Sequence, residues 1–155
     1  MISIVIAYYN RRPQLLKTLE SIWHYGRPEI IIVDDASTER IDDIPGITLI
    51  RIEPEEKTWL NPCIPYNIGF SKAKGDIIIM QNPECIHVGD ILSYSKKIKE
   101  NQLLSFAAYS LDYSLNYRKY NLEKLRKLIA KEPQECQVEH HGWYNHSVHR
   151  PVAYH

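Results

Sequence analysis

The sequence has few cysteines, no excess of charge of either sign and no long apolar run. Its cysteines, Cys63, Cys85 and Cys136, are odd in number and far apart, which argues against a disulfide framework and favours a reducing compartment. Lys+Arg and Asp+Glu both number 19, so no strong field attracts nucleic acid. The longest apolar run is far too short to span a bilayer, and no basic segment of a signal peptide follows Met1. We therefore expect a cytoplasmic protein with no transmembrane segment and no nucleic-acid partner.

The chain has 155 residues, a length that suits one domain with a hydrophobic core. Short apolar runs dominate its first half. Runs of this kind predict strands over Ile2–Ala7, Ile30–Val33, Ile47–Ile52 and Asp76–Gln81. Ile77–Met80 is too short for a helix and does not alternate with polar residues, which indicates a strand covered on both faces. A further strand is predicted over Leu103–Ser110.

Apolar residues at helical spacing separate several of these strands. Pro13 begins a predicted helix that ends at Gly26, and its apolar face carries Leu15, Leu16, Leu19, Ile22 and Trp23. Other predicted helices carry Ile64 and Ile68, begin at the N-cap Asp90, or begin at the N-cap Asn121. Two consecutive strand–helix–strand units at the N-terminus predict a parallel, doubly wound α/β sheet. Ala7–Asn10 and Asp34–Ser37 should then face one cleft at the carboxyl ends of the strands.

Polar side chains at these strand ends are the candidates for ligand binding. Asp34 or Asp35 could accept a hydrogen bond from a nucleobase imide or a ribose hydroxyl. Capping of a helix or turn by Asp35 or Ser37 is the alternative, and the two interpretations weigh about equally. Glu84 and Asn82 would point the same way in extended geometry, so their oxygens could converge on Mg²⁺ or Mn²⁺. From spacing alone, a solvated turn bent by Pro83 is the favoured interpretation of this pair.

The histidine-rich end of the chain gives a weaker signal. His140, His141, His146, His149 and His155 lie close together in the sequence after Cys136. No Cys-x-x-Cys pair accompanies them, so a surface loop with one or two functional histidines is favoured over a structural zinc site.

Three motifs occur together in the first ninety residues. Ile2–Asn10 combines an opening strand with a turn similar to Pro-x-Tyr-Asn, with Ala7 in place of proline. Ile30–Ser37 matches the Val-Asp-Asp-x-Ser signature, and Asn67–Gly69 with Ala73–Asp76 matches an Asn-x-Gly…Ala-x-Gly-Asp/Glu segment. Motifs in this order and at this spacing resemble the N-terminal, nucleotide-sugar-binding part of GT-A fold glycosyltransferases, most similar to family 2.

The resemblance implies a GT-A (Rossmann-like) three-layer α/β sandwich with a mostly parallel central sheet. It implies one domain over residues 1–155, with a donor-binding half over 1–90 and the start of an acceptor half, incomplete, over 91–155. It also implies an inverting glycosyltransferase that transfers a sugar from a nucleoside-diphosphate sugar, UDP-sugar first among them, to a glycan, protein or other hydroxyl acceptor. The first loop and the second aspartate of the pair contact the base in this family, here Tyr8 and Asp35.

The other site residues follow from the same resemblance. The nucleotide-sugar-binding set comprises Ala7, Tyr8, Asn10, Asp34, Asp35, Asn67 and Asn82. The metal-binding pair is Glu84 with Asn82, which would hold Mn²⁺ or Mg²⁺ at the position of the family's Asp-x-Asp motif. Trp143 and Tyr144 are candidate contacts for the acceptor sugar, with core packing as the equal alternative.

The sequence departs from the family pattern at two places. Asn82-Pro83-Glu84 replaces Asp-x-Asp, so the site has one negative charge fewer and weaker metal binding is expected. No acidic residue follows Glu139, so no general base is assigned, and the catalytic residue stays unknown. The alternatives are therefore a fragment of a longer enzyme or a non-catalytic nucleotide-sugar-binding module. A dehydrogenase or kinase is not supported, because Gly-x-Gly-x-x-Gly and Gly-Lys-Ser/Thr motifs are absent.

Overall fold

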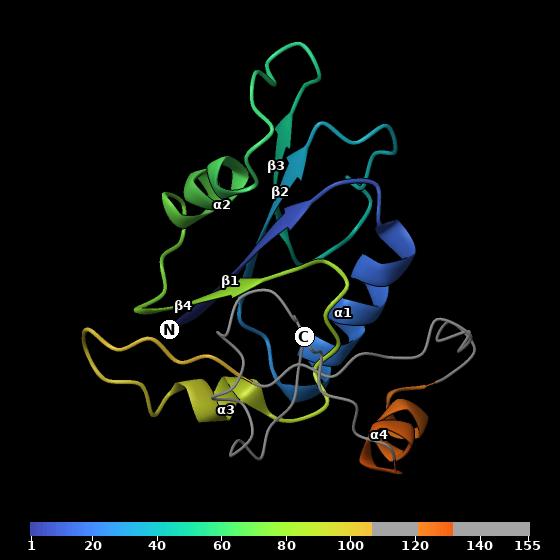
Figure 1. Ribbon diagram of the computed structural model, residues 1–155, viewed down its shortest axis with the longest axis vertical. Coiled ribbons are helices and arrows are strands. Elements are labelled where there is room, and N and C mark those ends of the chain that lie inside the picture. Colours follow the sequence, from blue (N-terminus) through green and yellow to red (C-terminus); the bar gives the residue numbers. More distant parts are fainter. Residues whose placement is uncertain (107–120, 132–155) are drawn as a thin grey trace, which may run out of the picture.

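The computed structural model describes residues 1–106 and 121–131, and its centre is a parallel four-stranded sheet. The strands are β1 (Ile2–Tyr8), β2 (Glu29–Asp35), β3 (Thr48–Ile52) and β4 (Ile77–Gln81), in the order β3-β2-β1-β4 (Figure 1). All pairings are parallel, and Ile4 lies between Ile30 on one side and Ile79 on the other. The carboxyl ends of all four strands therefore meet at one edge of the sheet.

Helices cover both faces of this sheet and make three layers (Figure 1). α1 (Arg12–Tyr25) and α3 (Ile91–Ser95) contribute to the core on one face, and α2 (Cys63–Phe70) contributes to the core on the other. A further helix is α4 (Leu122–Lys131). Alternate residues of a strand face opposite sides. One side of β1 and β2, with Ile4, Ile6, Ile30 and Ile32, packs with Leu15, Leu19 and Ile22 of α1. The other side, with Val5, Ile31 and Val33, packs with Tyr66, Ile68 and Phe70 of α2.

The strand order reverses next to β1. The chain moves outward from β1 to β2 and β3, and then α2 carries it back across the sheet to β4 on the far side of β1. Such a reversal is the topological switch point at which open α/β sheets bind ligands, outside the carboxyl ends of the strands. The ends of β1 and β4 lie at this point.

Two sequence predictions about the sheet are wrong. The segment between β2 and β3 contains turns in place of a second crossover helix, although Ile41 and Ile44 from this segment are buried in the α1 side of the core. β4 does alternate in burial: Ile79 is buried whereas Ile78 and Met80 are exposed, so described residues cover only one of its faces. The sequence of β4 does not show this alternation, because apolar residues occupy both faces of the strand.

The helix boundaries agree better with the sequence. Asp90 caps α3 by accepting a hydrogen bond from the Ser93 N–H at 3.0 Å, and Asn121 caps α4 through the Lys124 N–H at 2.9 Å. These caps confirm the two predicted N-termini. The strand predicted from Leu103 is not formed over residues 103–106, and its remainder lies outside the described residues.

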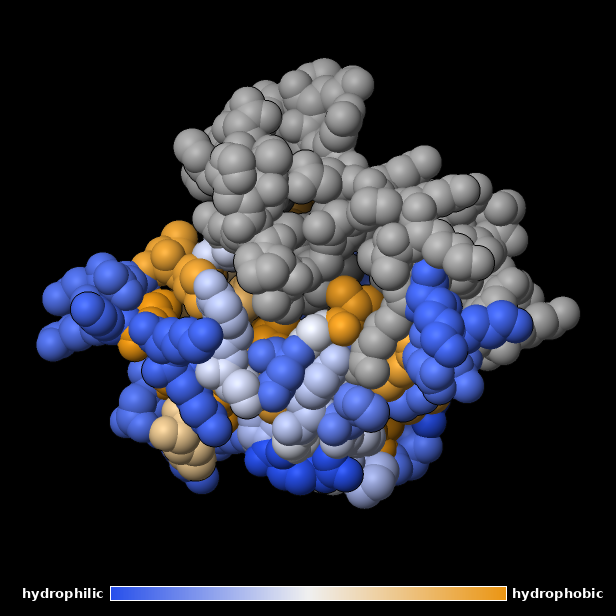
Figure 2. All heavy atoms as spheres, turned by 90° about the horizontal axis from the view of Figure 1, so that it is seen from below, coloured by the Kyte–Doolittle hydropathy of each residue, from blue (hydrophilic) through white to orange (hydrophobic). Residues whose placement is uncertain are grey.

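Exposed hydrophobic side chains are dispersed over the described surface. Leu60 and Leu103 are almost fully exposed, in loops that lie far apart in the sequence. The face seen in Figure 2 is mostly hydrophilic, with separate hydrophobic patches between the charged residues. Within the described residues, no helix has the length and apolar character needed to cross a membrane.

Candidate functional site

Three polar segments meet at the carboxyl edge of the sheet. The first loop, Tyr9–Arg11, follows β1. The second loop comprises residues 36–38, which follow β2, and is described together with Asp34 and Asp35 at the end of that strand. The third segment is the turn Asn82–Cys85 after β4, closed by a hydrogen bond from the Cys85 N–H to the Asn82 carbonyl at 3.3 Å. Side chains of all three segments contact one another or the adjacent loop before α2.

Asn10 joins the first loop to the second. Its backbone N–H donates to Ser37 Oγ at 3.0 Å, and its side-chain oxygen accepts from the Thr38 N–H at 2.9 Å and the Thr38 hydroxyl at 3.0 Å. Its φ of 49° lies in the left-handed region, which asparagine tolerates better than most residues. Asn10 and Ser37 therefore fix the relative position of the loops after β1 and β2, as predicted for segments facing one cleft.

Asp34 is fully buried and holds the second loop in place. Its carboxylate accepts a hydrogen bond from the Ser37 N–H at 3.0 Å and forms an ion pair with Arg51, its register partner on β3. Arg51 also donates to the Ser37 carbonyl at 2.7 Å, and the bond to Asp34 raises the pKa of the guanidinium. The buried carboxylate thus organises the loop, in which Ala36 has a φ of 65°, and offers no surface to a ligand.

Asp35 lies beside it with a partly accessible carboxylate. The side chain is 16% exposed, and its two oxygens accept from Lys57 Nζ at 2.8 Å and from the Trp59 indole N–H at 3.1 Å. Lys57 and Trp59 belong to the loop between β3 and α2, and the Lys57 ammonium also lies 5.0 Å from the centre of the Tyr9 ring. This arrangement places one acidic, one basic and two aromatic side chains together at the edge.

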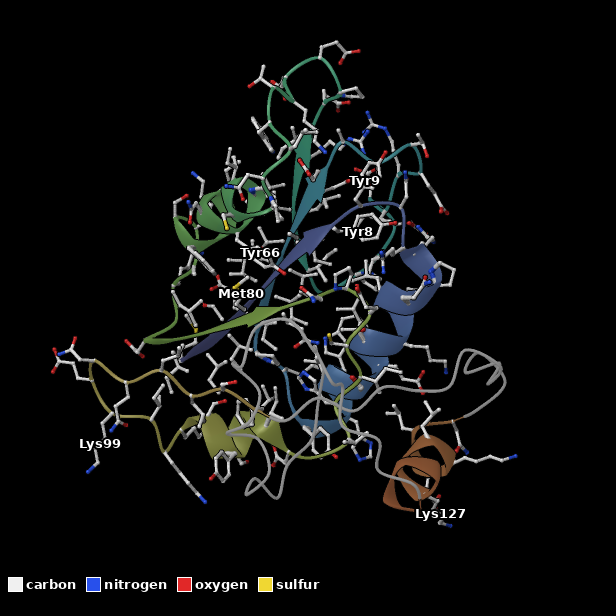
Figure 3. The ribbon with its side chains drawn as sticks, in the orientation of Figure 1. Tyr8, Tyr9, Tyr66, Met80, Lys99 and Lys127 are labelled. Carbon is white, nitrogen blue, oxygen red and sulfur yellow. The ribbon has the colours of Figure 1, made fainter. Side chains whose placement is uncertain are left out.

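The two tyrosines at the end of β1 have opposite environments. Tyr8 continues the face of Ile4 and Ile6 and is 1% exposed, whereas Tyr9 is 52% exposed (Figure 3). Burial raises the pKa of the Tyr8 hydroxyl. Tyr8 therefore packs in the core, and its ring has no free surface for a nucleobase. The exposed ring of Tyr9 can offer that surface. Ala7 is half-buried at the same strand end, paired with Val33.

The third segment does not have the extended geometry expected for a pair of converging oxygens. Because Asn82–Cys85 is a turn, Asn82 and Glu84 contact different elements. The Asn82 side-chain oxygen lies 2.9 Å from the Tyr66 hydroxyl of α2, while Glu84 accepts from the Arg11 guanidinium at 3.0 Å. Tyr66 is buried, which raises the pKa of its hydroxyl and keeps it a hydrogen-bond donor.

Glu84 and Asn82 are the predicted ligands of a divalent cation, and in the turn their side chains contact different elements. Glu84 and Asn82 offer the hard oxygens that Mg²⁺ and Mn²⁺ prefer, and both side chains are exposed. Over residues 1–106 and 121–131, no group of three or more His, Cys, Asp or Glu side chains is placed to hold a metal ion. A cation here would therefore need further oxygens from a ligand such as a diphosphate, and it would displace Arg11 from Glu84.

Of the remaining predicted site residues, the structure describes only Asn67. Asn67 is exposed on α2, and its carbonyl accepts from the Ser71 N–H at 3.1 Å. Trp143 and Tyr144 lie outside the described residues. The site residues predicted from the sequence did not include Tyr9, Arg11, Lys57, Trp59 or Tyr66. The match to Pro-x-Tyr-Asn, which aligns its tyrosine with Tyr9, was the one available signal.

A parallel sheet with polar loops at its switch point defines a class of α/β protein that binds ligands at this edge, and two solved structures share the fold. S. aureus TarS has 18% identity and a TM-score of 0.50, over 61% of this chain and 18% of that chain. Mannosyltransferase PcManGT from Pyrobaculum calidifontis, in complex with GDP-Man and Mn²⁺, has 18% identity and a TM-score of 0.50, over 71% of this chain and 35% of that chain.

Glycosyl transferase family 2 matches residues 3–142, so the chain belongs to this family. The predicted α/β GT-A architecture and the predicted family are thereby confirmed. No curated protein matches the sequence significantly. The chain spans about a third or less of the two solved structures it resembles.

Proposed function

We propose that this chain carries the donor-binding part of an inverting glycosyltransferase that uses a nucleoside-diphosphate sugar, with UDP-sugar as the first candidate. The proposal rests on one observation in this family 2 chain: the first loop, the second loop and the Asn82–Cys85 turn contact one another at the switch point of the sheet. In this proposal residues 1–90 form the donor-binding half, and residues 91–155 begin the acceptor half.

The base would lie beside Tyr9 and Asp35. Tyr9 offers an exposed aromatic ring at the end of β1, and Asp35 offers a partly accessible carboxylate at the end of β2. Asn10 and Asp34 would contribute to binding indirectly, because they fix the two loops that carry the Tyr9 ring and the Asp35 carboxylate. Ala7 lies at the same end of β1, and Asn67 remains a proposed contact on α2.

Glu84, with Asn82, would hold Mn²⁺ or Mg²⁺ at the diphosphate. A divalent ion bound there would neutralise negative charge on the departing nucleoside diphosphate. Arg11 must release Glu84 for this contact, and its guanidinium is then free to bind a phosphate oxygen. Tyr66 keeps the Asn82 amide oriented from the α2 side.

In the proposed reaction, an acceptor hydroxyl oxygen bonds to the anomeric carbon as the bond from that carbon to the phosphate oxygen breaks. The hydroxyl proton passes to a general base, and the electron pair of the broken bond leaves with the nucleoside diphosphate. The described residues hold the donor side of this reaction. Trp143 and Tyr144 remain proposed contacts for a glycan or protein acceptor, and the widely spaced cysteines favour a cytoplasmic setting.

Thermal melting with nucleotide sugars tests this function. UDP-, GDP- and dTDP-sugars would be compared with and without Mn²⁺, because a ligand that binds only the native state raises Tm. We expect a rise with UDP-sugar that Mn²⁺ increases, and a Glu84→Ala variant should lose the metal-dependent part. Unchanged metal dependence in Glu84→Ala would contradict the metal assignment, and no rise with any donor would contradict the function.

Binding of the donor without transfer is the second candidate. The specific observation is that Asn82-Pro83-Glu84 stands in place of Asp-x-Asp, so the predicted metal position has one carboxylate fewer. Release of nucleoside diphosphate from the donor, with and without hydroxyl acceptors, separates the two. Turnover supports the enzyme, whereas donor binding with no release supports the binding module.

A further inference from the structure

Four polar side chains are buried where the chain that leaves β4 runs beside α1 (Figure 1). Thr18 and Ser21 belong to α1, Gln81 ends β4 and His87 follows the turn, and each of these side chains is at most 1% exposed. Burying a polar side chain costs free energy unless the side chain forms hydrogen bonds. Their hydrogen bonds join α1 to residues 81–87, so this cost is offset only while α1 and the turn stay together.

Thr18 connects α1 directly to the middle of the turn. Its hydroxyl donates to the Pro83 carbonyl at 2.8 Å. A threonine inside a helix commonly donates to a carbonyl in the preceding turn of its own helix, whereas here the single hydroxyl proton leaves the helix. The Pro83 carbonyl belongs to the planar peptide group that ends at the Glu84 Cα. Holding this oxygen therefore fixes the backbone from which the Glu84 side chain projects.

The other buried side chains hold the chain after Glu84. The Gln81 amide N–H donates to the Cys85 carbonyl at 3.0 Å, and the Gln81 amide oxygen lies 2.6 Å from His87 Nε2. The His87 backbone N–H donates to Ser21 Oγ at 2.9 Å, which anchors this end of the segment on α1 as well. The backbone is thus held on both sides of Glu84, while the Glu84 side chain is 39% exposed.

Two contacts of different kinds therefore link α1 to the turn. Arg11, at the start of α1, pairs with the Glu84 carboxylate at 3.0 Å, and Thr18 lies about two helical turns further along. The Arg11 contact is exposed, so a cation can replace it, whereas the Thr18 contact is buried away from any ligand. A fixed backbone would keep Glu84 in place when Arg11 releases its carboxylate.

We propose that Thr18 is a positioning residue for Glu84, whose hydroxyl holds the Pro83–Glu84 peptide so that the carboxylate stays within reach of a divalent cation on a donor diphosphate. This proposal rests on the proposed function and names a residue behind the binding edge on which that edge depends. Thr18 contacts neither the nucleotide nor the cation. Its effect is therefore confined to binding that requires the cation.

Calorimetric titration of the chain with UDP, once in Mn²⁺ and once in EDTA, tests the proposal. Thr18→Val keeps the branched shape and removes the hydroxyl, so it should weaken UDP about tenfold in Mn²⁺ and less than about twofold in EDTA. Thr18→Ser keeps the hydroxyl and removes a buried methyl group, so it should lower Tm but hold the UDP affinity in Mn²⁺ within about twofold of the unmodified chain. A purely structural role predicts instead that the affinity follows Tm in both variants.

Thr48→Val is the matched control, since Thr48 is exposed at the start of β3, on the edge of the sheet opposite the site. It should leave the UDP affinity unchanged in both conditions. An unchanged gain from Mn²⁺ in Thr18→Val, or the loss of that gain in Thr18→Ser, would overturn the proposal and leave the donor site intact. UDP binding to the unmodified chain with no gain from Mn²⁺ would contradict this proposal and the metal assignment. No UDP binding at all would contradict the proposed function as well.

Discussion

Tyr8 and Tyr9 are adjacent in the sequence, but one side chain is buried and the other is exposed. Tyr8 follows Ile4 and Ile6 at intervals of two, so the pleat turns it into the core, and Tyr9 lies beyond the strand with half its surface exposed. The resemblance to family 2 implied Tyr8 as the base contact. The structure leaves Tyr9 as the tyrosine that a ligand can reach.

Arg11 should act in opposite ways on the metal and on the nucleotide. In Arg11→Gln the ion pair with Glu84 is lost, so the carboxylate is free and Mn²⁺ alone should bind about threefold or more tightly. A nucleoside diphosphate should bind more weakly in the same variant, because one charged donor to a phosphate oxygen is missing. Calorimetric titration of each ligand separately measures both effects.

Glu84→Gln provides the comparison, since it removes the carboxylate for which Arg11 and the metal compete. In that background the Arg11→Gln substitution should no longer change the affinity for Mn²⁺. Unchanged Mn²⁺ affinity in Arg11→Gln alone would show that the ion pair does not compete with the metal.

At the scale of elements, the glycines of two motifs allow the close packing of the chain around β1. A Cβ on Gly69 of α2 would lie 2.3 Å from Val5 Cγ1, and a Cβ on Gly75 would lie 2.6 Å from the Ser3 N–H nitrogen. Gly69 therefore lets α2 approach the sheet, and Gly75 lets the chain enter β4 beside β1. The Asn-x-Gly and Ala-x-Gly-Asp matches have a structural basis here that does not involve a ligand.

Gly69→Ala should destabilise the protein by about 1–3 kcal/mol, because the added methyl group overlaps Val5 in a packed core. Urea denaturation followed by circular dichroism measures the change. Lys72→Ala, an exposed change just after α2, should stay within about 0.5 kcal/mol of the unmodified chain. A similar free energy of unfolding for Gly69→Ala would mean that α2 can move away from the sheet without cost.

Elements with an apolar period were predictable from the sequence, and elements without one were not. The four strands follow from their apolar patterns, and the start of α4 follows from its cap. On α1, Leu15, Leu19 and Ile22 are buried as predicted, whereas Leu16, predicted on the same face, is exposed. The link from β2 to β3 buries Ile41 and Ile44 without a helix, because neighbouring parallel strands need only a chain that packs on the sheet. Likewise, the exposed face of β4 could not be read from Ile77–Met80, which is apolar on both sides.

At the scale of the whole molecule, the amino ends of the strands are held by a network opposite the candidate site. The Glu29 carboxylate of β2 accepts from the Ser3 hydroxyl of β1 and from the Lys74 N–H at 2.9 Å, and the Gly75 N–H donates to Ser3 Oγ at 2.8 Å. This network links β1, β2 and the chain entering β4. The Ser3 hydroxyl, and then the Lys74 N–H, lower the pKa of Glu29 in the folded protein.

The stabilisation from Glu29 should depend on pH. Since its pKa is lowered on folding, the charged carboxylate stabilises the fold above the ordinary carboxyl pKa, and this contribution disappears as the pH falls through the folded-state value. The difference in unfolding free energy between the unmodified chain and Glu29→Gln should therefore be larger near pH ~7 than near pH ~3. Urea denaturation at both pH values measures it, and a difference independent of pH would contradict the role of the charge.

The candidate site was predictable only in part, and for a physical reason. Asp35 and Glu84 lie in motifs at strand ends, so their place at the edge follows from parallel topology. Lys57 and Trp59 come from a loop with no period, and only the folded chain shows that they reach Asp35. Asp34 differs from its neighbour because Arg51 lies opposite it on β3, a pairing that depends on register.

The ion pair between Arg11 and Glu84 joins residues 73 positions apart, and the sheet that supports it pairs β1 with β4 over a similar separation. Closing a loop of this length costs entropy before the contact forms, so we expect these contacts to form late in folding. The site would then be complete only after the main barrier to folding has been crossed. A nucleotide should accordingly slow unfolding while leaving the rate of folding almost unchanged.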